Sequence, residues 1–247
     1  MRSRCWRGCP IKLSEVTILV VDDEPALRDI FAKWLKAVGC GRVLTAADGA
    51  AALEVVKDEQ VDLLITDVRM PVMDGVMLVR SLAKLDKPIP SIVFVSGFGD
   101  VNRKEMYGLG VEAFVSKPFD RSEVLGVLER AVSRRSRLWL TPMTIVPRQR
   151  FTLEAGGAGA AGANASIQLG RGGFSARYSG VLSLSKVNFR CNFAAKEREL
   201  TGHGYVRWNS RDDQTVGIEF SYLDESCRSW VLEEIEANNP RSFIPDF

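Results

Sequence analysis

Five polar residues follow successive apolar segments in the first half of the chain. They are Asp22, Asp23, Asp67, Ser96 and Lys117. Carboxylates placed together repel one another unless a cation joins them, and Mg²⁺ is a hard cation that prefers oxygen ligands. A lysine supplies a fixed positive charge for a phosphoryl group, and a serine supplies a hydroxyl donor. The set predicts phosphoryl chemistry in which Asp67 is the nucleophile and forms an aspartyl phosphate.

The expected secondary structure brings these residues to one place. Strand-like and helix-like segments alternate between residues 16 and 135. Strands are expected near 17–22, 43–46, 62–66, 91–96 and 112–116, and helices near 25–38, 49–57, 74–85, 100–109 and from Asp120 onward. Five such repeats predict an α/β fold with a five-stranded parallel, doubly wound sheet. Ligands of these sheets bind at the C-terminal ends of the strands, where all five polar residues would lie.

Four motifs occur in order along this region: LVVDDEP (19–25), ITDVRMPVMDG (65–75), FVSG (94–97) and FVSKPF (114–119). With them, the region resembles the receiver domain of a two-component response regulator, which has a flavodoxin-like fold. The resemblance implies that a sensor histidine kinase phosphorylates Asp67. It also implies no enzymatic activity beyond assisting this domain's own Mg²⁺-dependent phosphorylation and dephosphorylation. A phosphatase with an aspartate nucleophile normally needs a second aspartate two residues on, where this chain has Arg69.

The same resemblance assigns roles around Asp67. Mg²⁺ would be bound directly by Asp23, by Asp67 and by the backbone carbonyl of Arg69. Asp22 would act on the metal through water. In the same family pattern, Lys117 would bind the phosphoryl group, and Ser96 and Phe114 would move toward it as switch residues. The Lys117–Pro118 bond would be cis.

The second half of the chain has a different pattern. In 187–193 apolar and polar residues alternate, and 204–208 and 216–220 are similar short segments. A helix is expected after Asp224. This pattern predicts a small antiparallel β-barrel with one helix, and it disfavours a DNA-binding helix-turn-helix.

Domain boundaries are expected where composition changes. An N-terminal tail would cover 1–14 and the receiver domain 15–135. An arginine-rich linker broken by prolines would cover 136–147, before a C-terminal domain at 148–247. Within that domain, the Gly/Ala-rich segment 154–165 is expected to be a mobile loop.

The C-terminal domain resembles a PilZ domain, a β-barrel known for binding cyclic di-GMP. The resemblance rests on LGRGGFS (169–175), TGHGYVRWN (201–209) and VGIEFSYLDE (216–225). The ligand motifs of that family are degenerate here. Where the family has an aspartate or asparagine followed by a serine, alignment on Gly173 finds Gln168 and Gly170.

The arginine motif of the PilZ family also departs from its pattern. The family has two arginines four residues apart, whereas this chain has Arg148 and Arg150, and Thr152 stands where the second is expected. The candidates for contacts with cyclic di-GMP are therefore Arg148, Arg150, Arg171 and Gly173. This leaves three alternatives for the output: protein interaction controlled by Asp67, a second input from cyclic di-GMP, or a passive interaction module beside a receiver that acts alone.

The composition limits the classes of binding partner that are expected. The net charge is +2, with 26% charged residues of both signs spread along the chain, which does not indicate nucleic acid or a membrane surface. Five irregularly spaced cysteines and a single histidine predict no zinc site and are typical of a cytoplasmic protein. No segment is long enough to span a bilayer. The expected partners are the kinase, a downstream protein and a second copy bound through the receiver domain.

Overall fold

The computed structural model describes residues 13–97, 102–132, 139–140, 147–155, 167–193 and 198–246. Contacts divide the chain into two compact units, the first with Met1–Asp100 and Ala113–Arg134 and the second with Val101–Glu112 and Arg135–Phe247. Most of the expected tail at 1–14, linker at 136–147 and Gly/Ala-rich loop at 154–165 lies outside the described residues. The division by contacts assigns 101–112 to the second unit, and the domain boundaries expected from the sequence stay a prediction.

The first sheet has five strands in the order β2-β1-β3-β4-β5. They are β1 (Thr17–Val21), β2 (Arg42–Ala46), β3 (Leu63–Asp67), β4 (Ser91–Ser96) and β5 (Val111–Ser116). The pairs β1–β2, β1–β3 and β3–β4 are parallel in continuous register. The predicted five-stranded parallel α/β sheet is confirmed. Its central strand β3 is buried along its whole length, as expected for a parallel strand that is covered on both faces.

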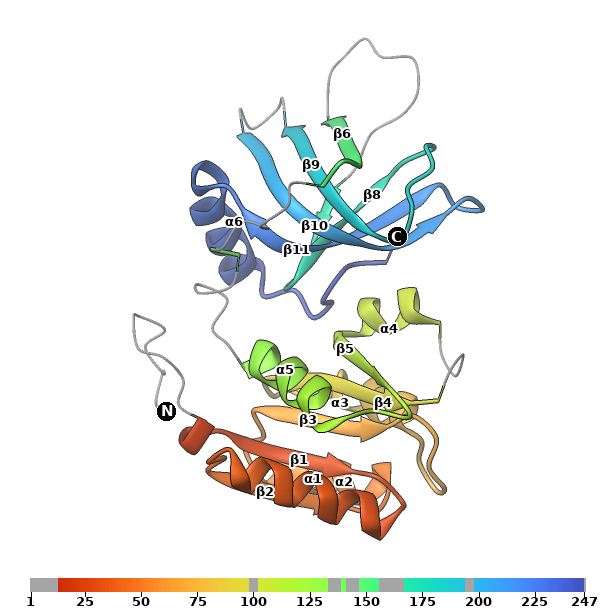
Figure 1. Cartoon of the computed structure of the whole chain (residues 1–247), viewed down its shortest axis with the longest axis vertical. Coiled ribbons are helices and arrows are strands. Elements are labelled where there is room, and N and C mark those ends of the chain that lie inside the picture. Colours follow the sequence, from red (N-terminus) through yellow and green to blue (C-terminus); the bar gives the residue numbers. More distant parts are fainter. Residues whose placement is uncertain are drawn as a thin grey trace. The chain divides into compact units, whose positions relative to one another are not determined.

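Helices follow each strand of this sheet. They are α1 (Pro25–Ala37), α2 (Gly49–Asp58), α3 (Gly75–Leu82), α4 (Arg103–Leu109) and α5 (Arg121–Val132), after a short 3-10 helix at Leu13–Glu15. Helices α1 and α5 share one hydrophobic core with β1, β3, β4 and β5, and Figure 1 shows both on the same side of the sheet. The predicted N-cap of α5 is confirmed, because the Asp120 carboxylate accepts the Glu123 N–H at 2.9 Å.

The second sheet has six strands in the order β6-β9-β10-β11-β8-β7. They are β6 (Arg150–Ala155), β7 (Ile167–Leu169), β8 (Gly173–Arg177), β9 (Lys186–Phe193), β10 (Arg198–Ser210) and β11 (Thr215–Leu223), followed by α6 (Glu225–Asn238). The expectation of a wholly antiparallel sheet is wrong, because β6 pairs with β9 in parallel. These two strands are separated by β7 and β8, so a long crossover can join them in parallel where a tight hairpin could not.

The second sheet is curled rather than flat (Figure 1). The ring of Phe151 on β6 lies 5.9 Å from that of Phe174 on β8, although three strands separate β6 from β8. The predicted alternation in 187–193 is confirmed, with Val187, Phe189 and Cys191 fully buried. Helix α6 adds its apolar residues to the same core. The structure therefore shows a curled sheet with a helix against it, which is less than the closed barrel that the sequence predicts.

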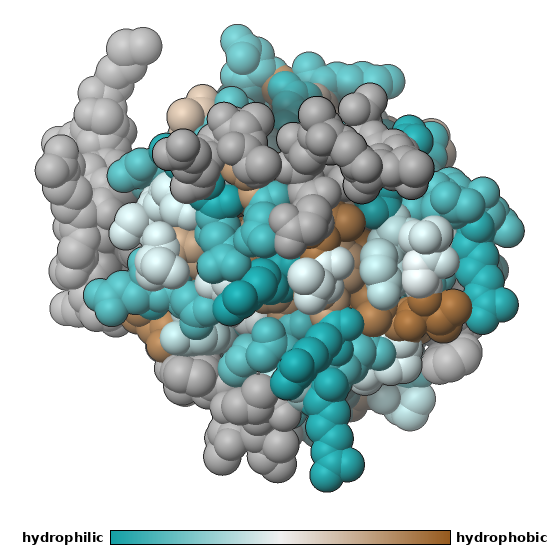
Figure 2. Space-filling view, turned by 90° about the horizontal axis from the view of Figure 1, so that it is seen from above, coloured by the Kyte–Doolittle hydropathy of each residue, from teal (hydrophilic) through white to brown (hydrophobic). Residues whose placement is uncertain are grey.

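Polar and apolar side chains are mixed on the surface of the described residues. Figure 2 shows hydrophilic residues interspersed with small hydrophobic groups on one face. Among the large apolar side chains, Val181 and Leu184 are 67% and 70% exposed in the loop before β9. Within the described residues, no helix is both long enough and apolar enough to cross a membrane.

Candidate functional site

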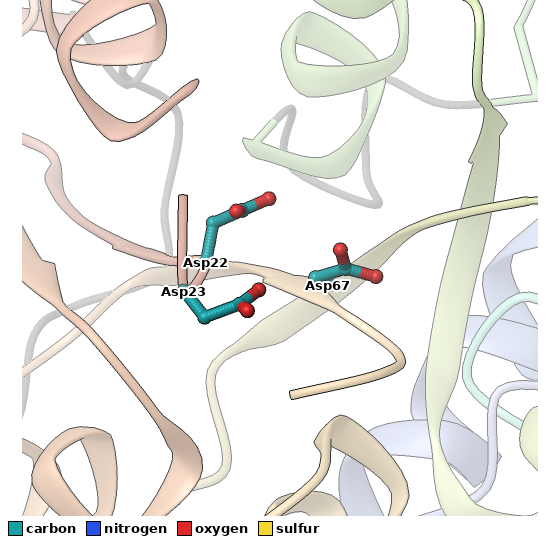
Figure 3. A group of neighbouring side chains, drawn as sticks. All are labelled: Asp22, Asp23 and Asp67. Atoms are coloured by element: carbon teal, nitrogen blue, oxygen red, sulfur yellow. The ribbon is translucent and has the colours of Figure 1, made fainter. Parts of the chain in front are cut away.

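Three carboxylates meet at one edge of the first sheet. Asp22 and Asp23 come directly after β1, and Asp67 ends the neighbouring strand β3. One carboxylate oxygen from each residue lies within 4.8 Å of the others. Figure 3 shows the three side chains projecting from the adjacent strand ends to the same side. Asp22 and Asp67 are buried whereas Asp23 is exposed, so the cluster opens to solvent at Asp23.

Lys117 is the cation of this cluster. It follows β5, and its Nζ lies 2.5 Å from Asp67 Oδ2 and 3.4 Å from Asp22 Oδ2. The bond between Lys117 and Pro118 is cis, as the family resemblance implies. Lys117 thus pairs with Asp22 and Asp67, and these four residues together carry three carboxylates against one ammonium group.

The surroundings shift two pKa values in this cluster. Burial raises the pKa of Asp22 and the charge of Asp67 adds to the rise, against the Glu24 N–H and Lys117, which lower it. Burial also lowers the pKa of Lys117, but its hydrogen bond and charge interaction with Asp67 outweigh this, and the net shift is upward. Lys117 therefore stays protonated, and an added cation near the buried Asp22 would favour its ionised form.

The other predicted residues lie around the cluster. The Arg69 N–H donates to Asp67 Oδ1 at 3.2 Å, which places that backbone beside the carboxylate. Ser96 ends β4 next to Val95, the register partner of Asp67, and its carbonyl accepts the Lys117 N–H at 2.8 Å. The Ser96 hydroxyl itself donates to the Gly97 carbonyl at 2.9 Å. The strand ends thus bring the predicted set together, while its roles in chemistry stay predictions.

Phe114 lies on β5 and is half-buried. Its ring meets that of Phe94 edge-on, with centroids 6.0 Å apart. Sequence reasoning missed Arg28, whose Nη1 donates to the Asp22 carbonyl at 2.5 Å and supports the strand end that carries the cluster. The signal was its place in the first turns of the helix that follows Asp22 and Asp23.

The arginines proposed for cyclic di-GMP are not gathered in the same way. Arg148 and Arg150 are exposed, and Arg150 begins β6 at one edge of the second sheet. Arg171 lies in the turn between β7 and β8, at the other edge, and is only 7% exposed. Its guanidinium already contacts three protein groups: it donates to the Gly110 and Arg241 carbonyls and pairs with Glu112.

Backbone packing explains why glycine stands at position 173. A Cβ atom at this position would lie 2.2 Å from the Ile218 carbonyl oxygen of the neighbouring strand β11. The close approach of two backbones therefore requires glycine here. This explains the residue without a ligand.

Comparison with known families identifies the part of the chain that carries the carboxylate cluster. Residues 18–129 match the response regulator receiver domain family. The five-stranded parallel fold and the acidic cluster agree with this match, so residues 18–129 are a response regulator receiver domain. The matched segment is less than half of the chain.

Individual relatives align with about half of the chain. The response regulator GtcR of Aneurinibacillus migulanus is 32% identical over 118 residues, covering 48% of this chain and 48% of its own length. The transcriptional regulatory protein FixJ of Rhizobium meliloti is 37% identical over 120 residues, covering 48% of this chain and 58% of FixJ. The chain thus spans about half the length of these relatives.

A solved structure aligns over the same region. The chemotaxis response regulator CheY4 of Vibrio cholerae is 29% identical, with a TM-score of 0.43, and the alignment covers 47% of this chain and 98% of that structure.

Proposed function

We propose that the protein is a response regulator of a two-component phosphorelay and that Asp67 accepts a phosphoryl group from a histidine kinase. The observation that carries this proposal is the contact of Lys117 Nζ with Asp67 Oδ2 at 2.5 Å inside a cluster of three carboxylates. A carboxylate oxygen is thereby held beside a fixed positive charge at a solvent-accessible strand edge. This arrangement suits a nucleophile that must receive an anionic group.

Phosphoryl transfer to Asp67 exchanges a P–N bond for a P–O bond. An oxygen of the Asp67 carboxylate attacks the phosphorus of the kinase phosphohistidine, forming a P–O bond as the P–N bond breaks. The imidazole keeps the bonding electron pair and takes a proton from solvent. Lys117 turns from the carboxylate to the new phosphoryl oxygens, and the Ser96 hydroxyl donates to one of them. The chain mainly positions groups and neutralises charge, as phosphoryl transfer requires.

The donor set fits Mg²⁺. Its three side chains offer only oxygen atoms, and one oxygen from each lies within 4.8 Å of the others. Among the described residues, Lys117 pairs with two of these three carboxylates, Asp22 and Asp67. We propose that Asp23, Asp67 and the Arg69 carbonyl would hold the ion directly and that Asp22 would hold it through water. Bound Mg²⁺ supplies charge neutralisation for the phosphoryl oxygens.

Incubation with acetyl phosphate and Mg²⁺ tests this proposal. Intact-protein mass spectrometry should detect the gain of one phosphoryl group, and peptide mapping after borohydride reduction should place it on Asp67. Asp67→Asn should remove the gain, whereas Asp86→Asn, at an exposed position outside the cluster, should retain it. Transfer to another residue, or none with Mg²⁺ present, would contradict the proposal.

For the second unit, we propose a PilZ-like output domain that acts by binding other proteins. Its support is the curled sheet with α6 against it and the occupied guanidinium of Arg171. Phosphorylation adds a charge of about −1.5 to −2 at Asp67, which would shift the receiver between conformations. Beryllofluoride with Mg²⁺, a mimic of the aspartyl phosphate, should then change the oligomeric state in light scattering. An unchanged mass at saturation would exclude self-association as the output.

A second candidate function is a two-input sensor that also binds cyclic di-GMP. The observation in its favour is the exposure of Arg148 and Arg150, which are available to an anionic ligand. Isothermal titration calorimetry with the full-length protein separates the two candidates. Heat at micromolar ligand that is lost in Arg150→Gln would favour the sensor.

DNA binding is the function suggested by relatives such as FixJ, which is named as a transcriptional regulatory protein. The match to FixJ covers only 48% of this chain. In the described part after residue 147, α6 is the only helix, whereas a helix-turn-helix needs two. We therefore propose an output that does not contact DNA, and a gel-shift titration with genomic fragments would test this.

A further inference from the structure

Arg171 is a buried arginine whose partners all come from its own compact unit. Its Nη2 donates to the Gly110 carbonyl at 2.7 Å and its Nε donates to the Arg241 carbonyl at 3.2 Å. Its Nη1 forms an ion pair with Glu112 Oε1 at 2.8 Å. The side chains of Arg171 and Glu112 are only 9% and 11% exposed. Two charges with so little water around them depend on each other.

The same unit holds the helix before Gly110. The Tyr107 ring stacks with those of Trp208 and Phe243, with both centroid distances 6.0 Å. The Phe243 N–H donates to the Tyr107 carbonyl at 2.9 Å. At the other end of α4, Lys104 pairs with Asp213 and with Asp246. Helix α4 is therefore bound along its length by β10, the β10–β11 turn and the C-terminal segment.

Gly110 is shaped for this contact. Its φ is +102°, and a Cβ atom would lie 2.7 Å from the Arg241 carbonyl oxygen and 3.2 Å from Arg171 Nη2. A side chain here would push the guanidinium away. The residue therefore allows the backbone to approach Arg171 closely enough to bond with it.

The bound segment continues into the phosphorylation site. Glu112 is the second residue of β5, and this strand ends one residue before Lys117, which contacts Asp67. Side chains two residues apart on a strand share a face, so Glu112 and the proposed switch residue Phe114 lie on the same side of β5. A movement of β5 that accompanies phosphorylation would act on the Arg171–Glu112 pair through the chain itself.

We propose that Arg171 is a latch that holds Gly110 and Glu112 while Lys117 is bonded to the Asp67 carboxylate, and that phosphorylation of Asp67 and opening of this latch are coupled. The inference rests on the proposed function of Asp67. It assigns Arg171 to regulation instead of nucleotide binding. Since coupling between two equilibria is reciprocal, a weakened latch favours the phosphorylated arrangement.

The test measures the affinity of the full-length protein for beryllofluoride with saturating Mg²⁺, followed by tryptophan fluorescence. Glu112→Gln keeps the side-chain shape but removes the charge opposite Arg171. It should lower the dissociation constant by about five-fold or more, the lower end of common coupling strengths. Lys104→Gln weakens the hold on α4 at a less buried place and should act in the same direction if Glu112→Gln fails to fold. Arg190→Gln removes an exposed pair with Glu199 and is the matched control.

The outcomes separate the two proposals. Tighter binding in the two latch variants, with the control unchanged, supports the latch. Unchanged affinity in folded Glu112→Gln and Lys104→Gln overturns it and leaves the function of Asp67 intact. If the unaltered protein neither binds beryllofluoride nor gains a phosphoryl group, the proposed function fails and the latch fails with it.

Discussion

The two units differ in how far neighbouring groups compensate the charge of their clustered polar residues. In the first unit, Asp22 and Asp67 pair with Lys117 in a cluster of three carboxylates, and the third, Asp23, faces solvent. In the second, Arg171 is matched by a carboxylate and two carbonyls from its own unit and is buried. One cluster has unbalanced charge and room for a partner, whereas the other is already neutral. Charged residues mark a ligand site when the fold leaves their charge uncompensated, and they mark a structural contact when the fold compensates it.

Replacing the nucleophile is expected to have the largest effect on this comparison. Asp67→Asn keeps the side-chain size but removes the charge and the attacking oxygen, so the protein should no longer bind beryllofluoride and Mg²⁺ together. Fluorescence titration measures this, with Asp86→Asn as the control. Binding that persists in Asp67→Asn would show that the uncompensated cluster is not the phosphoryl site.

Removing the lysine should have the next largest effect. Lys117→Gln keeps a hydrogen-bond donor but loses the charge that faces Asp67 at 2.5 Å. Loss of one well-placed electrostatic group costs about 100-fold in rate. Quenched-flow phosphorylation by acetyl phosphate should therefore slow by about this factor. If the rate of phosphorylation of Lys117→Gln stays within about two-fold of that of the unaltered protein, Lys117 has a structural role and not an electrostatic one.

Magnesium should stabilise the first unit by a smaller amount. At a concentration about twenty times its dissociation constant, a ligand of the folded state adds about 1.8 kcal/mol of stability. Thermal unfolding should therefore shift upward by a few degrees with Mg²⁺, and Asp23→Asn should reduce the shift.

The pH dependence of this stabilisation has a definite sign. Because the pKa of Asp22 in the fold is raised above 3.8, ionisation of this carboxyl destabilises the metal-free protein as pH rises from 3.8 through the raised value. Mg²⁺ needs the ionised carboxylates. The thermal shift with Mg²⁺ should grow over the same interval, and a shift that is independent of pH there would argue against a role for Asp22.

The sequence predicted the first unit better than the second for a physical reason. Buried parallel strands are continuous apolar runs, and the residue after each run is at the ligand edge whatever the neighbouring loops do. Asp67 and Lys117 could therefore be placed at the same edge of the sheet from the sequence, although β4 lies between their strands. The contact of Arg28 with the Asp22 carbonyl could not, since it depends on a rotamer in the helix that follows.

In the second unit, local sequence patterns predict less of the strand pairing and of the side-chain contacts. The alternation in 187–193 correctly predicts which face is buried, but not that the strand pairs in parallel with β6. A buried arginine and a solvated one are identical in sequence. The two carbonyls that accept from Arg171 are 61 and 70 residues away in sequence. No sequence periodicity connects groups that are so far apart. The sequence alone therefore groups Arg171 with Arg148 and Arg150, although the structure gives it partners of its own.

The smallest effect is expected from cyclic di-GMP. Calorimetry with the full-length protein should show no heat at tens of micromolar ligand, because Arg171 is already bonded and the side chains at 168 and 170 lack the carboxylate and hydroxyl of the family motif. A serine at position 170, which would restore the hydroxyl of the family motif, does not fit the structure. A Cβ atom at Gly170 would lie 2.5 Å from the Phe243 carbonyl oxygen, so serine here would displace the C-terminal segment whose carbonyls help to hold the turn. Binding heat that is lost in Arg150→Gln but kept in Arg190→Gln would contradict this expectation. The second unit would then also contain uncompensated charge that binds a ligand, and the contrast between the two units would not hold.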